Sequence, residues 1–117
     1  MGKPMETSVP GVTVESLTEL LASGRPVRVL DVRRAPAFEK SPKVIPGAER
    51  VLPDQVRLWG ERAQDKSVPV IAYCVHGHEV SQGAAAELIS RGFNASFLVG
   101  GVSEWESRGN VVRAVDA

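Results

Sequence analysis

The chain has 117 residues, of which 43% are hydrophobic and 24% charged, a balance typical of one globular domain with a buried core. Fourteen basic residues offset fourteen acidic ones, so the formal net charge is zero and supplies no bulk attraction to nucleic acid or to an anionic membrane. We expect a single domain over residues 1–117, with a core at about 10–112 and a loose, polar N-terminus at 1–9.

Helix and strand signals alternate along the chain. Thr13 suits the N-cap of a first helix over residues 14–21 that stops by Gly24. Further strands are expected at 27–31, 48–52, 68–73, 96–99 and 111–113. Further helices are expected at about 37–39, 53–63, 81–91 and 102–107. This alternation favours a mostly parallel sheet between helices, in which ligands bind beyond the carboxyl ends of strands.

The only cysteine and both histidines fall together in the segment Cys74-Val75-His76-Gly77-His78. The thiol is the first residue after the apolar strand at 68–73 and precedes the helix at 81–91. In that position loop N–H groups and the helix N-terminus can stabilise a thiolate. Gly77 would allow several N–H groups to converge on one point, and Ser81 is expected to be the helix N-cap.

Four segments, in this order, resemble the single-domain rhodaneses, which are the thiosulfate sulfurtransferase family. They are Val29-Leu30-Asp31-Val32-Arg33 with Phe38 and Ile45-Pro46-Gly47-Ala48, then Cys74 with Gly77, then residues 88–93, and then 98–105. The resemblance implies a rhodanese-like three-layer α/β/α fold with a central, mostly parallel sheet. It also implies that Cys74 takes sulfane sulfur from a donor such as thiosulfate, holds it as a persulfide and passes it to a thiol acceptor.

The same resemblance assigns a substrate-binding loop and a set of partners. The loop comprises Val75, His76, Gly77, His78, Glu79, Val80 and Ser81. The implied partners are a small anionic sulfur donor, a thiol acceptor and, in some settings, a sulfur-relay protein, with no metal or organic cofactor. Asp31 and Arg33 follow another strand and either border the pocket or form a structural ion pair, and the ion pair is the favoured reading. Metal binding by Cys74 and the two histidines is disfavoured, because alternate positions of one short loop give poor tetrahedral geometry.

Two features of the loop depart from the family. No arginine or lysine lies between Cys74 and Gln82, and Glu79 adds negative charge. Protonated histidines of the loop, or Arg50 and Arg57 from elsewhere, would have to supply the missing positive charge.

The loop also looks one residue longer than usual, as in the cell-cycle phosphatases and arsenate reductases of the same superfamily. Those enzymes place an arginine at the end of the loop, which this chain lacks. An oxyanion-handling phosphatase or arsenate-reductase-like enzyme therefore remains an alternative, as does a non-catalytic rhodanese-like binding module.

The location of the protein follows from missing signals alone. A single cysteine cannot form an internal disulfide, and residues 1–6 lack the apolar core of a signal peptide. We therefore expect a cytoplasmic protein, although a removed leader would leave the same chain.

Overall fold

The computed structural model describes residues 9–63 and 65–114, so most of the predicted loose segment at 1–9 lies outside the described residues. A five-stranded, all-parallel sheet with the order β1-β6-β5-β2-β4 forms the centre. Its strands are β1 (Gly11–Val12), β2 (Arg28–Asp31), β4 (Glu49–Arg50), β5 (Val70–Tyr73) and β6 (Ala95–Leu98). A separate antiparallel pair joins β3 (Lys43–Val44) to β7 (Arg113–Ala114).

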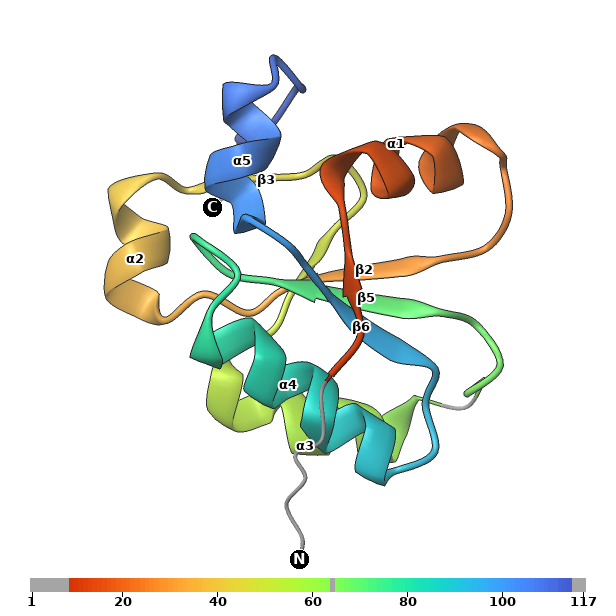
Figure 1. Cartoon of the computed structure of the whole chain (residues 1–117). Helices are drawn as coiled ribbons and strands as arrows, with labels where there is room; N and C mark the ends of the chain where they lie inside the picture. Colours follow the sequence, from red (N-terminus) through yellow and green to blue (C-terminus); the bar gives the residue numbers. More distant parts are fainter. Residues whose placement is uncertain (1–8, 64, 115–117) are drawn as a thin grey trace, which may run out of the picture.

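Helices cover both faces of the sheet, which gives three layers (Figure 1). One face carries α1 (Val14–Ala22) and α5 (Gly101–Ser107), and the other carries α3 (Val56–Arg62) and α4 (Glu79–Ser90). The short helix α2 (Ala35–Lys40) lies to one side of these layers and follows the carboxyl end of β2. The predicted three-layer α/β/α architecture is confirmed.

Side chains alternate between the two faces along the central strands, because successive residues of a strand point in opposite directions. Val29 and Ile71 pack with α1 and α5, whereas their neighbours Leu30 and Ala72 pack with α3 and α4. Every residue of β5 is buried, as predicted for a strand covered on both faces. The end of β5 is therefore held rigidly from both sides.

The structure departs from the expected elements mainly in short segments. The two-residue strands β1 and β3 were not predicted. The expected strand at 48–52 shrinks to β4, and the expected helix at 53–63 begins as a 3₁₀ turn over Pro53–Gln55 before α3 starts. Thr13 caps α1 as predicted, with its Oγ1 accepting from the Ser16 N–H at 3.1 Å. Within the described ranges, no helix combines the length and apolar character needed to cross a membrane.

Candidate active site

Cys74 directly follows β5, at the carboxyl edge of the parallel sheet. Its side chain is buried, with 6% of its surface exposed, yet it lines a pocket of about 180 Å³. The pocket wall is formed by Arg33, Arg34, Ala37, Cys74, Val75, His76, His78, Glu79 and Val80. A pocket of this size has room for a small anion. The thiol is thus shielded from bulk solvent but reachable by a small reagent.

Ser81 contacts the thiol instead of capping the helix. The helix α4 begins at Glu79, and His78 is its N-cap. The His78 carbonyl accepts from the Gln82 N–H at 3.1 Å, which starts the helical ladder two residues earlier than predicted. The prediction of Ser81 as N-cap was therefore wrong.

The buried hydroxyl of Ser81 lies 3.1 Å from the sulfur of Cys74. The same oxygen lies 3.5 Å from the His78 carbonyl, which can accept its proton while the thiol donates to it. A hydroxyl can accept from a thiol and, after rotation, donate to a thiolate. Ser81, which is buried and does not itself line the pocket, can therefore donate a hydrogen bond to negative sulfur on Cys74.

The loop after Cys74 is fixed by the N-terminus of α5. The N–H groups of Val102 and Ser103 donate to the carbonyls of Cys74 and Val75, each at 2.9 Å. In a trans peptide the next N–H points opposite to the carbonyl, so the N–H groups of Val75 and His76 point away from α5. Within the described ranges, no backbone N–H from residues 75–81 donates to an acceptor. These groups can bind an anion.

Glycines make this close approach possible. Gly77 has φ +79°, and a Cβ there would lie 2.7 Å from the Leu98 carbonyl oxygen. Gly101 has φ +64°, and a Cβ there would lie 2.4 Å from the Cys74 carbonyl oxygen. Any larger residue at either position would push the loop away from α5. Gly101, in the segment 98–105 that resembles the rhodaneses, therefore allows the close contact with the thiol loop.

A buried ion pair stands beside the pocket. Arg33 is 2% exposed and Asp31 is fully buried; their closest atoms, Nη2 and Oδ2, are 2.6 Å apart. Arg33 also donates to the carbonyls of Ser41 and Lys43 at 3.0 and 2.7 Å. Burial alone would lower the pKa of the Arg33 guanidinium, but the hydrogen bonds and charge of Asp31 outweigh it and raise that pKa. The favoured structural ion pair is thus present; Arg33 borders the pocket, whereas Asp31 is not among the lining residues.

Tyr73 links this ion pair to the residue before the thiol. Its hydroxyl donates to Asp31 Oδ2 at 3.1 Å and accepts from the Ile45 N–H at 3.0 Å. Burial, reinforced by the negative charge of Asp31, raises the pKa of the Tyr73 hydroxyl well above its ordinary value. The hydroxyl therefore stays protonated and holds the carboxyl end of β5 in place.

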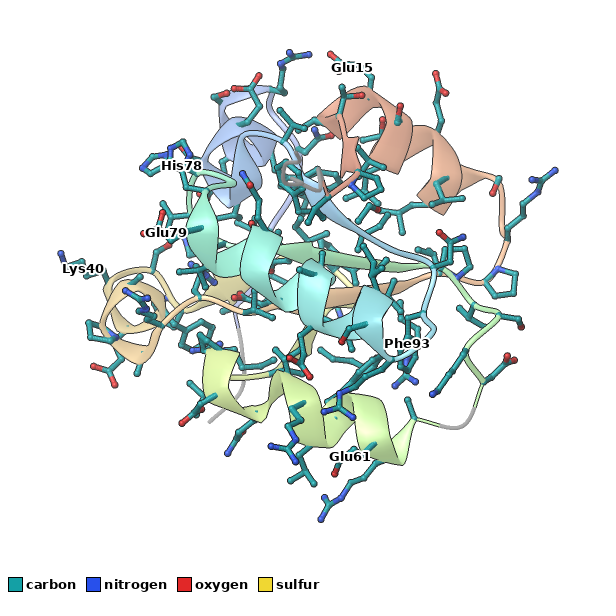
Figure 2. All side chains as sticks on the ribbon, turned by 60° about the horizontal axis from the view of Figure 1, so that its bottom comes forward. Glu15, Lys40, Glu61, His78, Glu79 and Phe93 are labelled. Atoms are coloured by element: carbon teal, nitrogen blue, oxygen red, sulfur yellow. The ribbon has the colours of Figure 1, made fainter. Side chains whose placement is uncertain are left out.

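Other predicted residues fall at different distances from the thiol. His76, His78 and Glu79 are exposed and line the mouth of the pocket, and Figure 2 shows His78 and Glu79 at the first turn of α4, on the side that faces Lys40 of α2. The two imidazole ring centres are 6.1 Å apart. Among the described residues, no group of three His, Cys, Asp or Glu side chains is arranged to hold a metal ion.

Arg50 and Arg57 do not supply the missing charge. Arg50 donates to the Asp31 carbonyl at 3.2 Å and stacks on Phe38, with its guanidinium 4.3 Å from the ring centre. Arg57 pairs with Glu61 at 3.3 Å, one helical turn along α3. Neither residue lines the pocket of the thiol, so the suggestion that they approach it was wrong.

The sequence reasoning missed two residues of the pocket wall, Ala37 and Arg34, of which Arg34 is the charged one. It follows the strand β2 by three residues and lines the pocket from the start of α2. The alternation of strands and helices was only a partial signal: residues after the carboxyl ends of parallel strands share one edge of the sheet, but the structure alone shows that β2 lies next to β5.

The chain is similar to known proteins in sequence and in fold. The family described as rhodanese-like domain matches residues 13–108 of the chain. The curated thiosulfate sulfurtransferase GlpE of Pseudomonas fluorescens is 40% identical over 81 residues, which cover 68% of this chain and 70% of that protein. GlpE of Coxiella burnetii is 32% identical over 88 residues, covering 74% and 78% respectively. The solved rhodanese-like domain of the Anabaena Alr3790 protein has 26% identity and a TM-score of 0.77, covering 95% of this chain and 81% of that one.

Proposed function

Because the chain belongs to the rhodanese-like domain family, we propose that it is a thiosulfate sulfurtransferase-like enzyme that carries sulfane sulfur as a persulfide on Cys74. The observation that supports this most is the geometry at the thiol. The thiol lines a small pocket, a buried hydroxyl contacts its sulfur, and the N–H groups of residues 75–81 are not taken up by backbone acceptors within the described ranges. The proposed partners are a small anionic donor and a thiol acceptor.

The first half-reaction loads the thiol. The Cys74 thiolate attacks the outer sulfur of thiosulfate, a new S–S bond forms, and the S–S bond of the donor breaks. Sulfite leaves with the electron pair, and Cys74 is left as a persulfide anion. Charge balances, since a thiolate and a dianion give a persulfide anion and sulfite. In this proposal the Ser81 hydroxyl, 3.1 Å from the sulfur, and the N–H groups of residues 75–81, which have no backbone acceptor among the described residues, stabilise negative sulfur throughout.

The second half-reaction removes the outer sulfur from the Cys74 persulfide. An acceptor thiolate attacks the terminal sulfur of the persulfide, takes that sulfur, and returns Cys74 as a thiolate. The outer sulfur carries the negative charge between the two steps, so the same hydroxyl and N–H donors serve both. A relay protein that presents a cysteine would enter at this step, in place of a small thiol.

Intact-protein mass spectrometry after incubation with thiosulfate tests the proposal. We expect a gain of one sulfur atom that is lost on adding cyanide or a thiol, and no gain in Cys74→Ser. No gain in the unchanged chain, with the thiol still open to alkylation, would contradict the proposal. Arsenate and phosphate esters would then be the next reagents, because an arseno- or phospho-thiol adduct would identify the oxyanion-handling alternative.

A further inference from the structure

Arg34 lies between the thiol pocket and a second hollow beside it. It is the N-cap residue of α2, and its side chain makes no capping bond and is exposed. It lines the pocket of Cys74 and also a neighbouring hollow of about 360 Å³. Glu79 and Val80 line both spaces as well, so Arg34 stands where the two join.

The charges around the thiol leave one guanidinium available. Arg33 is committed to Asp31 and to two carbonyls. By contrast, the Arg34 side chain takes part in none of the ion pairs and hydrogen bonds found among residues 9–63 and 65–114. Glu79, which also lines the pocket, carries the opposing charge. An anion entering the pocket can therefore pair with the guanidinium of Arg34, whereas that of Arg33 is already paired.

We propose that Arg34 binds the anionic end of the sulfur donor and makes the pocket prefer doubly charged donors; this rests on the function proposed above. The donor class has a sulfane sulfur joined to a sulfonyl group: the dianion thiosulfate is the preferred member, and the monoanionic organic thiosulfonates are bound less well. A guanidinium can hold two oxygens of such a group at once, which a point charge cannot. The positive charge that the loop after Cys74 lacks is thus supplied by α2.

Alkylation of Cys74 tests the charge at the thiol without any sulfur chemistry. The thiolate displaces iodide from neutral iodoacetamide or from anionic iodoacetate, and the ratio of the two rates reports the local field. Replacing Arg34 with glutamine should lower the iodoacetate-to-iodoacetamide ratio about three- to tenfold, as expected for losing one nearby charge in a partly solvated site. Glu79→Gln should raise the ratio.

Arg57→Gln is the matched control. Arg57 lines the neighbouring hollow but not the pocket of Cys74, and its side chain is 71% exposed. Its loss should leave the alkylation ratio nearly unchanged, whereas Arg34→Lys should keep most of the preference for iodoacetate. An unchanged ratio in folded Arg34→Gln would overturn the assignment.

Donors of graded charge complete the test. Thiosulfate is a dianion and methanethiosulfonate a monoanion; both transfer one sulfur to the thiolate, releasing sulfite or methanesulfinate. Arg34→Gln should raise the KM for thiosulfate severalfold more than that for methanethiosulfonate. Equal effects on both donors would overturn the donor assignment even if the alkylation ratio fell. Absence of sulfur gain from either donor in the unchanged chain would instead contradict the proposed function, while the alkylation ratio would still decide whether Arg34 draws anions to Cys74.

Discussion

At the residue scale, the contact between Ser81 and Cys74 has the most direct chemical consequence. The hydroxyl is fully buried, and its oxygen lies 3.1 Å from the sulfur of Cys74. It therefore has few hydrogen-bond partners other than the thiol. A donor held in place at negative sulfur strengthens as charge develops, because the buried hydroxyl is not screened by direct contact with solvent. The hydroxyl is therefore expected to stabilise the persulfide form of Cys74 more than the free thiol.

Ser81→Ala is expected to slow persulfide formation about tenfold, the effect of losing one hydrogen-bond donor to an anion. Stopped-flow measurement of thiosulfate consumption under single-turnover conditions gives the rate. Ser90→Ala is the control, because Ser90 lies on the same helix and its hydroxyl only donates to the Glu87 carbonyl on the exposed side. A rate equal to that of the unchanged chain would mean that Ser81 merely fills space.

Tyr73 is the only tyrosine of the chain, which makes its titration easy to follow. Burial raises its pKa in the folded protein above the unfolded value of about 10. The folded state therefore retains a proton that the unfolded state releases above that pH, so the stability from this group is complete below about pH 10 and declines as the pH rises further.

The expected result is a free energy of unfolding that falls with pH above about 10, and a slope that is smaller in Tyr73→Phe. Urea titrations at several alkaline pH values measure this slope, and tyrosinate absorbance should appear only as the unchanged chain unfolds. Tyrosinate absorbance in the folded protein near pH 10 would contradict the raised pKa. At neutral pH the same substitution should cost about 1–3 kcal/mol, because it leaves the buried Ile45 N–H without its acceptor.

At the element scale, the sequence was most informative where an element makes its own signal. The apolar run at 68–73 and the apolar positions of the first helix predicted β5 and α1 closely. The strands β1 and β3 escaped notice because two residues carry no periodicity, and only their partners β6 and β7 define them. Propensity decides long elements, whereas tertiary pairing decides the shortest ones.

The site was predicted in part for the same reason. Cys74 and its loop are contiguous, so one stretch of sequence displays them together. Arg34 is forty residues away and lines the same pocket as the thiol only because β2 and β5 are neighbours in the sheet. The alternation of strands and helices does not by itself specify that these two strands are neighbours. The misplaced start of α4 has a local cause: Ser81 has the chemistry of an N-cap, but in the folded chain its hydroxyl is engaged by the thiol.

The junction between the thiol loop and α5 yields a paired test of glycines. Gly101 and Gly24 both have positive φ, at +64° and +76°. A Cβ at Gly101 would lie 2.4 Å from a backbone oxygen of the loop, whereas one at Gly24 would meet nothing within 4 Å. Gly24→Ala should therefore cost about 1–2 kcal/mol for the backbone conformation alone.

Gly101→Ala should cost clearly more, about 3–5 kcal/mol, because the loop and α5 must separate. It should also slow alkylation of Cys74 or broaden its kinetics, which Gly24→Ala should not do. Thermal unfolding and iodoacetamide kinetics on the two variants provide the comparison. Similar losses of stability in both would show that the contact with the Cys74 carbonyl is not tight.

At the scale of the whole molecule, two apolar clusters pack on opposite faces of the sheet. A polar network of Asp31, Arg33 and Tyr73 lies at the carboxyl edge of the strands. The cluster under α1 and α5 includes Tyr73, and the cluster under α3 and α4 includes Val32, which follows Asp31. The Asp31–Arg33 pair and the Tyr73 hydroxyl therefore tie β2, β3 and β5 together at the edge that carries the thiol. Packing holds the layers, and this network fixes the geometry of the pocket.

Removing both charges of the Asp31–Arg33 pair should cost less stability than the sum of the two single removals. Asp31→Asn leaves the buried guanidinium of Arg33 without its counter-charge and is expected to cost about 3–5 kcal/mol, a large share of a typical domain's stability. Arg33→Met alone should cost a similar amount of stability, because it leaves the buried carboxylate of Asp31 without its counter-charge. The double variant Asp31→Asn/Arg33→Met removes both charges. Its loss of stability should be smaller than the sum of the losses in the two single variants.

Urea unfolding of the four proteins measures this coupling. A positive coupling of at least about 1 kcal/mol would establish the pair as one unit. If the single variants do not fold, a folded double variant gives the same answer by rescue. Additive effects would mean that each side chain is held by its carbonyl and hydroxyl partners alone. The edge of the sheet that carries Cys74 would then depend on backbone hydrogen bonds, and substitutions at Tyr73 should disturb the pocket more than those at Asp31.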